Sequence, residues 1–110
     1  MAKLGIVRYI DSAHGRKIHG HSFKIEMVFS GPVKEEMVDG IDFHEVIPTV
    51  ESVLKTIDKK YLNDIPELGR ATVENIAIYI IKHLNEYKTL ESVTVWEGLD
   101  KYATIFADEV

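Results

Sequence analysis

The sequence contains no cysteine, and this absence narrows the chemistry that the protein can perform. Disulfide bonds, thiolate metal ligands and a cysteine nucleophile are all excluded, so histidines and carboxylates are the ligands left for a metal ion. No apolar run approaches the roughly 20 residues of a membrane-spanning helix, and the N-terminal residues lack the pattern of a signal peptide. We therefore expect a cytoplasmic protein that makes no membrane contact.

Clustered positive charge is scarce as well. The net charge is −5, and the basic residues form no cluster beyond the pairs Arg16-Lys17 and Lys59-Lys60. Because binding to a phosphate backbone depends on many neighbouring cations, nucleic acid is not an expected partner. The 110 residues suit one compact core, so residues 1–110 are expected to form a single domain.

The apolar pattern of the first 40 residues predicts strands. β-prone residues between positions 3 and 10 predict a first strand that ends before a polar turn at Asp11-Ser12, and this strand delivers His14 to the start of a loop. Strict alternation from His19 to Phe29 predicts a second strand. A turn and a short strand are expected within residues 34–40.

Helical spacing replaces this alternation further along the chain. Asp42 suits the N-cap of a helix whose apolar face runs from Phe43 to Ile57, and Thr72 suits the N-cap of a second helix. Residues 58–70 between these helices are expected to form a loop.

Two short strands are expected at the end, at residues 92–97 and 102–107, around a turn at residues 98–100. Helices grouped between strand pairs are typical of an α+β fold, in which an antiparallel β-sheet carries both helices on one face.

Three of the five histidines are His14, His19 and His21, which lie within eight residues. Residues i and i+2 of a strand share one face, so His19 and His21 can present two imidazoles side by side while the adjoining loop brings in His14. Such nitrogen ligands suit Zn²⁺, and three protein ligands leave the fourth position open for substrate. Short histidine clusters also occur by chance, but Gly20 favours a site, because a glycine inside a strand often marks the close approach of a ligand.

The other two histidines have simpler explanations. His44 lies at the start of the first helix and His83 lies late in the second helix. We expect them to be solvated or to interact with a helix dipole.

Ser12-Ala13-His14 followed by His19-Gly20-His21 resembles the zinc signature of the 6-pyruvoyl-tetrahydropterin and 6-carboxy-tetrahydropterin synthase family. This resemblance implies the tunnelling fold (T-fold), in which sheets of several subunits join into a barrel, here a homo-oligomer that is a trimer or a hexamer of two trimers. The sites would then lie at subunit interfaces, with a pterin as the small-molecule substrate. Further similar segments are residues 37–43, residues 57–63, Ala71-Thr72-Val73-Glu74-Asn75 and Val95-Trp96-Glu97-Gly98.

The resemblance also implies roles for single residues. Glu97 would anchor the pterin ring, because a carboxylate accepts paired hydrogen bonds from two coplanar donors, and Thr72 would assist it. Each residue has an alternative role, Glu97 as an exposed carboxylate at a strand end and Thr72 as a helix cap. Asp58 and Lys59 occupy the positions of the family's Asp-His relay, so they are the candidate catalytic residues.

Two departures from the family pattern concern proton transfer. The family's cysteine is replaced by Gly15, with no carboxylate nearby in the shortened loop, and the relay histidine is replaced by Lys59. A lysine needs strong desolvation or a cationic neighbour to act as a base near neutral pH, and a solvated Lys59 is the simpler interpretation.

The sequence leaves three functions open. The leading hypothesis is a zinc-dependent lyase-like protein that acts on the hydroxylated side chain of a dihydropterin. The second hypothesis is retro-aldol cleavage of that side chain, which needs the same metal polarisation. The third hypothesis is a non-catalytic zinc- or pterin-binding module.

Overall fold

The computed structural model describes residues 1–14 and 19–110, and the side chains of residues 14 and 19–21 lie outside that description. Two long strands, β1 (Ala2–His14) and β2 (His19–Gly31), form an antiparallel hairpin. Strands β5 (Leu90–Glu97) and β6 (Lys101–Phe106) complete a four-stranded sheet in the order β1-β2-β5-β6. All neighbouring strands are antiparallel, as the sequence predicts.

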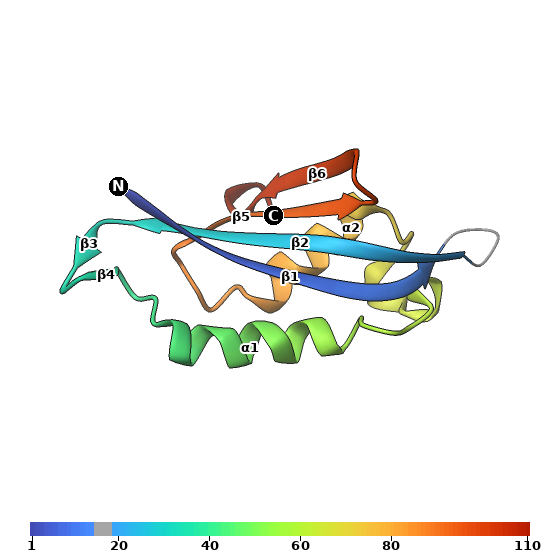
Figure 1. Ribbon diagram of the computed structural model, residues 1–110, viewed down its shortest axis with the longest axis horizontal. Helices are drawn as coiled ribbons and strands as arrows, with labels where there is room; N and C mark the ends of the chain where they lie inside the picture. The colour runs from blue at the N-terminus through green and yellow to red at the C-terminus, as the bar shows by residue number, and fades with distance from the viewer. Residues whose placement is uncertain (15–18) are drawn as a thin grey trace.

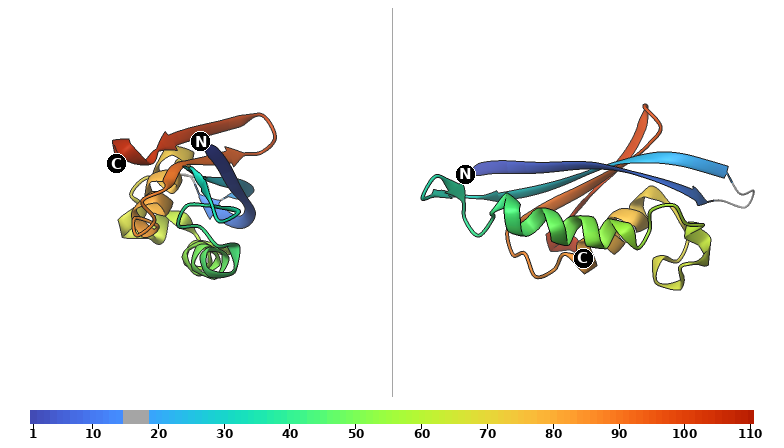
Figure 2. Two further views of the ribbon diagram at one scale, coloured as in Figure 1. Left: turned by 90° about the vertical axis from the view of Figure 1, so that its left-hand side faces the viewer. Right: turned by 60° about the horizontal axis from the view of Figure 1, so that its bottom comes forward.

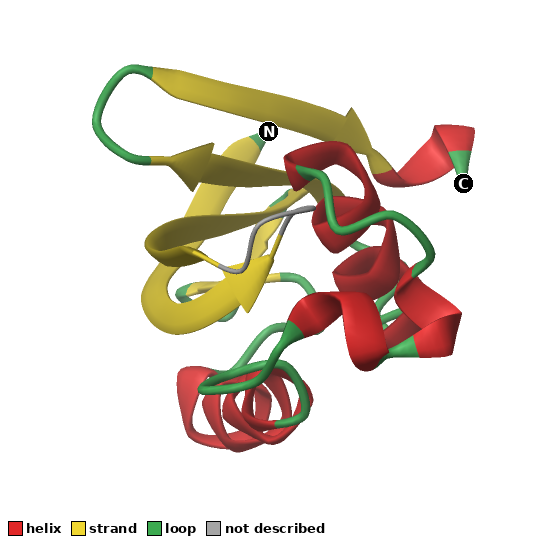
Figure 3. Cartoon of the chain, turned by 90° about the vertical axis from the view of Figure 1, so that its right-hand side faces the viewer, coloured by secondary structure: helices red, strands yellow, loops and turns green. Residues whose placement is uncertain are grey.

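Both helices lie on one face of this sheet. Helix α1 (Phe43–Lys55) and helix α2 (Val73–His83) run below the two long strands in the right-hand view of Figure 2. Figure 3 shows the same two layers, with the strands on one side and the helical segments on the other. This arrangement confirms the predicted α+β architecture. Between the helices lie two short 3-10 turns, η1 (Leu62–Asp64) and η2 (Pro66–Leu68), and a third turn, η3 (Ala107–Glu109), follows β6.

The core lies between the sheet and the helices. Alternate residues of β2 face the helices, and four of them are fully buried: Phe23, Ile25, Met27 and Phe29. The helices contribute apolar residues at helical spacing, which buries one stripe of each helix against the sheet. The buried helical side chains include Val46, Val50, Leu54, Ile76, Ala77, Ile80 and Ile81.

Both predicted N-caps are confirmed. Asp42 Oδ1 accepts a hydrogen bond of 2.9 Å from the backbone N–H of His44, and Thr72 Oγ1 accepts one of 3.1 Å from the N–H of Asn75. Each cap satisfies a donor that the first turn of a helix leaves without a partner. The helix starts are therefore fixed by local sequence.

Three expectations need correction. The first strand does not end before Asp11-Ser12 but continues to His14, its last residue, which lies in register opposite His19. Phe43, expected on the apolar face of α1, is 45% exposed. Helix α1 ends at Lys55, although Ile57 remains fully buried just beyond the helix.

The polar residues Asp11 and Ser12 stay in a strand because other segments satisfy their polar groups. The hydroxyl of Ser22 donates a hydrogen bond of 2.6 Å to Asp11 Oδ1, and Ser12 Oγ donates to the carbonyl of Ile57. Neither partner is visible in the local sequence of the first strand, where two polar residues indicate a turn.

The expected short strand within residues 34–40 belongs to a second, two-stranded sheet. Strands β3 (Val33–Lys34) and β4 (Met37–Val38) form a hairpin around Glu35 and Glu36. Both glutamates have positive φ, at 53° and 67°, as a type I′ turn requires. This hairpin lies at the opposite end of the molecule from residues 58–70 (Figure 1).

Among the described residues, no helix combines the length and the apolar character that a membrane crossing requires.

Candidate active site

The backbone register brings the three histidine positions together at one end of the sheet. His14, the last residue of β1, pairs with His19, the first residue of β2, and His21 pairs with Ser12. Directly paired residues and residues two apart on one strand share a face of an antiparallel sheet. The positions of His14, His19 and His21 therefore belong to one face of the hairpin.

The same register determines which face this is. Ile10, Ser12 and Phe23 are buried against the helical layer. Because side chains on a strand point to alternate faces, these residues and the three histidine positions lie on the same face of the hairpin. The histidine positions thus continue the core-facing side of the hairpin. Their side chains, and all of Gly15, Arg16, Lys17 and Ile18, lie outside the described residues, so the zinc site stays a prediction. Three histidine nitrogens are a suitable donor set for Zn²⁺, and the backbone placement is compatible with it.

Glu97 lies near this group on the neighbouring strand. It is the last residue of β5, is partly buried, and pairs with Phe23 on one side and Lys101 on the other. Phe23 is two residues beyond His21 along β2. With strand spacings of about 4.8 Å and a rise of about 3.4 Å per residue, the Cα atoms of Glu97 and His21 are about 8 Å apart. The structure therefore places the predicted pterin anchor beside the predicted metal ligands, on the same face of one sheet.

Thr72 comes from a different layer of the molecule. Its hydroxyl accepts the capping bond of α2, so the alternative role as an N-cap is confirmed, while its predicted contact with a pterin stays untested. The segment that leads into α2 lies at the same end of the molecule as the end of the β1–β2 hairpin (Figure 1).

Asp58 and Lys59 follow α1 and lie against the end of β1. Asp58 Oδ1 accepts a hydrogen bond of 2.9 Å from the backbone N–H of Asp11. The N–H of Lys59 donates to the carbonyl of Asp11 at 2.7 Å, and Lys59 has a φ of 55°, which is unusual for a residue with a side chain. The Lys59 side chain is exposed, as expected for a solvated lysine.

His83 and His44 are separate from this group. His83 is the last residue of α2, and its Nε2 lies 2.7 Å from Oε1 of Glu67. His44 is exposed in the first turn of α1. Neither histidine belongs to a cluster of metal-ligating side chains within the part of the chain whose side chains are described.

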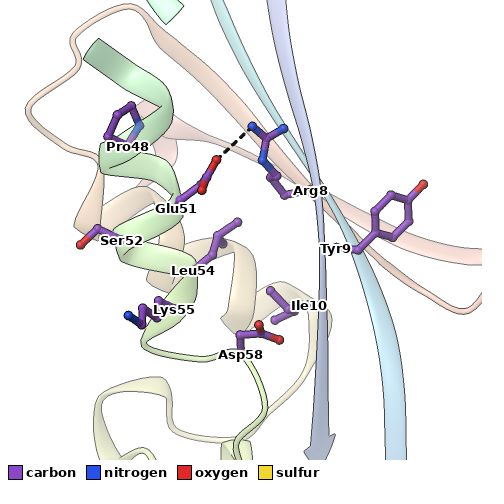
Figure 4. Close-up of a pocket in the computed structure, with 9 residues that line it drawn as sticks. All are labelled: Arg8, Tyr9, Ile10, Pro48, Glu51, Ser52, Leu54, Lys55 and Asp58. Atoms are coloured by element: carbon purple, nitrogen blue, oxygen red, sulfur yellow. Dashed lines mark hydrogen bonds and ion pairs between the residues drawn. The ribbon is translucent and has the colours of Figure 1, made fainter. Parts of the chain in front are cut away.

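A groove between β1 and α1 was not expected from the sequence. It has a volume of about 580 Å³, and an ion pair of 3.3 Å between Arg8 and Glu51 crosses it (Figure 4). Asp58 lines one end of the groove beside Ile10, but Glu97 and Thr72 do not line it. The groove has the size of a ligand pocket, and Lys55 and Asp58 line it besides the paired Arg8 and Glu51, but neither of the predicted pterin-binding residues reaches it. We therefore place the candidate active site at the histidine end of the sheet.

Comparisons with known proteins agree with this architecture. The sequence model of the 6-pyruvoyl tetrahydropterin synthase family matches residues 7–108. A dihydroneopterin monophosphate aldolase of Pyrococcus furiosus is 36% identical over 98 residues, which cover 80% of this chain and 82% of the relative. A protein of Archaeoglobus fulgidus, provisionally named 6-carboxy-5,6,7,8-tetrahydropterin synthase, is 40% identical over 91 residues, which cover 81% of this chain and 76% of the relative.

Solved structures show the same fold. The 6-pyruvoyl tetrahydropterin synthase of Caenorhabditis elegans superposes with a TM-score of 0.86 at 20% identity, covering 96% of this chain and 94% of that one. The 6-pyruvoyl tetrahydropterin synthase of Plasmodium vivax gives a TM-score of 0.75 at 20% identity, covering 94% of this chain and 96% of that one. The chain belongs to the 6-pyruvoyl tetrahydropterin synthase family, a family of pterin-processing proteins.

Proposed function

We propose that this protein is a zinc-dependent aldolase that cleaves the side chain of a phosphorylated dihydroneopterin. The observation that supports the proposal most strongly is the sheet register, which groups the positions of His14, His19 and His21 with Glu97 on one face. The aldolase named among the relatives supports this substrate class. Cleavage would release 6-hydroxymethyl-dihydropterin and glycolaldehyde phosphate.

The proposed reaction breaks the bond between the first and second carbons of the side chain. The hydroxyl on the second carbon loses its proton and becomes the carbonyl of the aldehyde product. The electron pair left on the first carbon is delocalised into the adjacent C=N bond of the dihydropterin ring until that carbon takes up a proton. Atoms and electrons balance without any oxidant or further reactant.

The residues of this chain suit such a reaction better than a synthase reaction. Retro-aldol cleavage begins at an O–H bond, whereas a synthase-type elimination begins at a C–H bond, which needs a stronger base. Gly15 and Lys59 occupy the positions where the family pattern has a cysteine and a histidine, so the usual acid-base groups are missing. Bound Zn²⁺ would polarise the oxygens of the pterin's side chain and so lower the pKa of the hydroxyl group that reacts. Glu97 would hold the ring in register through two hydrogen bonds.

Product analysis tests the proposal directly. Purified zinc-loaded protein is incubated separately with dihydroneopterin monophosphate, dihydroneopterin and dihydroneopterin triphosphate, and the products are identified by mass spectrometry. We expect 6-hydroxymethyl-dihydropterin from the monophosphate and none from a His19→Ala variant. Loss of triphosphate from the third substrate would instead identify a synthase, the activity named for the Archaeoglobus relative. Pterin binding without any product would identify a non-catalytic module.

We also propose that the protein is a homo-oligomer, a trimer or a hexamer of two trimers. Strands β1 and β6 are the two edges of the sheet, and unpaired edges favour pairing with another chain. The sheet face opposite the helices carries exposed apolar residues, among them Val7, Tyr9, Tyr102 and Phe106. Sedimentation velocity at micromolar concentration should show an assembly of three or six chains, and a monomer would contradict this proposal.

A further inference from the structure

The end of β1 and the segment after α1 are joined backbone to backbone. The carbonyl of Asp11 accepts the N–H of Lys59 at 2.7 Å, and the N–H of Ala13 donates to the carbonyl of Lys60 at 2.9 Å. Ala13 and Tyr61 also form a parallel bridge. The segment of residues 57–61, which we call the tether, thus lies along the last part of β1, directly before His14.

The Asp58 side chain adds a contact that the backbone alone cannot make. Its Oδ1 accepts the N–H of Asp11 at 2.9 Å, so Asp11 is held by the tether through both its N–H and its carbonyl. The Asp11 carboxylate in turn accepts the hydroxyl of Ser22 at 2.6 Å. Ser22 directly follows His21. A continuous chain of hydrogen bonds therefore connects Asp58 with both strands of the hairpin, next to two of the histidine positions.

Backbone strain shows that this arrangement is held firmly. Lys59 has a φ of 55°, a conformation that costs free energy in a residue with a side chain and persists only where the surroundings impose it. Ser12, the next residue of β1, is 6% exposed, and its hydroxyl donates a hydrogen bond to the carbonyl of Ile57. The tether therefore contacts Asp11, Ser12 and Ala13 in succession.

We propose that Asp58 is a positioning residue for the histidine-bearing end of the hairpin and not the group that transfers a proton. Its carboxylate accepts a backbone hydrogen bond and so fixes the strand end that carries His14. This inference rests on the proposed zinc site, because its effect is expressed as metal affinity. Groups that orient metal ligands typically change metal affinity by about 10- to 100-fold when they are removed.

Two substitutions at Asp58 separate positioning from proton transfer. Asp58→Asn keeps an oxygen that can accept the Asp11 N–H but abolishes the basic carboxylate, whereas Asp58→Ala removes both. Asp64→Ala serves as the matched control, because Asp64 lies in η1 just after the tether, is exposed, and has no side-chain hydrogen bond among the described contacts. Zinc affinity is measured by competition with a chromophoric chelator, and amide hydrogen exchange of Asp11 is measured in the metal-free protein.

We expect Asp58→Ala to weaken zinc binding by about 10-fold or more and to speed exchange at Asp11. Asp58→Asn should remain within about threefold of the wild type in zinc affinity and in turnover, and Asp64→Ala should match the wild type. If Asp58→Asn binds zinc normally but loses about 10²-fold or more in turnover, Asp58 transfers the proton and the proposal is wrong. Normal zinc affinity in Asp58→Ala would also overturn it.

The wild-type measurement distinguishes this failure from failure of the proposed function. A wild-type protein that binds no zinc would refute the metal site itself. A wild-type protein that binds zinc, together with an Asp58→Ala variant that binds it equally well, would refute only the positioning role.

Discussion

The hydroxyl oxygens of Tyr79 and Thr56 lie 2.7 Å apart and join the middle of α2 to the C-terminal cap of α1. Thr56 Oγ1 already donates to the carbonyl of Val53 at 2.6 Å, so Tyr79 is the donor in the bond between the two hydroxyls. Tyr79 is only 6% exposed, and its hydroxyl connects the two helices directly.

This relationship predicts the effect of Tyr79→Phe. The variant should lower the free energy of unfolding by about 1 kcal/mol, the usual contribution of one hydrogen bond, because the ring stays packed while the donor is lost. Urea unfolding followed by circular dichroism measures the change. Ser52→Ala is the control, since Ser52 is exposed on α1 and loss of its hydroxyl should change stability by less than about 0.5 kcal/mol.

The turn between β3 and β4 predicts a stabilising substitution. Glu35 and Glu36 both have positive φ, a conformation that asparagine and glycine adopt at lower cost. The double variant Glu35→Asn, Glu36→Gly should raise the free energy of unfolding by about 0.5–1 kcal/mol. A variant with Glu36→Ala alone should show no gain, because alanine has the same steric conflict. An equal gain from alanine would contradict the turn geometry.

The histidine positions predict the metal content. Protein purified or refolded with excess zinc should carry about one zinc per chain, because three histidine nitrogens suit zinc better than magnesium or calcium. His19→Ala should lose most of the metal, whereas His83→Ala should retain it because His83 lies beside Glu67. Elemental analysis measures both variants. Wild-type protein without any transition metal would refute the site.

The proposed hydrogen bonds between Glu97 and the pterin ring predict that Glu97 contributes to pterin affinity. Glu97→Gln should weaken binding by about 10- to 100-fold, because a charge-assisted hydrogen bond contributes about 1.5–3 kcal/mol. Fluorescence titration with a dihydropterin measures the affinity. The matched control is Glu91→Gln, which lies near the other end of β5 and pairs with Lys3 at 3.0 Å. Equal losses in both variants would show that Glu97 has no special contact with the ring.

The sequence predicted those features that depend on neighbouring residues. The caps Asp42 and Thr72 act through N–H groups two or three residues away, and the alternation along β2 follows from the pleat of a single strand. The grouping of the histidine positions also follows from local spacing, because His14 and His19 close one hairpin.

The features that the sequence missed depend on distant partners. Asp11 and Ser12 stay in β1 because they donate hydrogen bonds to residues more than 40 positions away. The Asp11 N–H donates to the Asp58 carboxylate, and the Ser12 hydroxyl donates to the Ile57 carbonyl. The exposure of Phe43 depends on how the start of α1 lies relative to the sheet. The tethering contact of Asp58 was equally hidden, since a carboxylate in a relay motif gives no sign that its partner is a backbone N–H.

The contacts between the tether and β1 also bear on the order of folding. Asp11 and Asp58 are 47 positions apart, and Ser12 and Ile57 are 45 apart, whereas the β1–β2 hairpin closes between neighbouring strands. Closing such a long loop is entropically costly, so contacts of high sequence separation form after local ones. The hairpin is therefore expected to assemble first, and its histidine-bearing end to become rigid only when α1 has docked against the sheet.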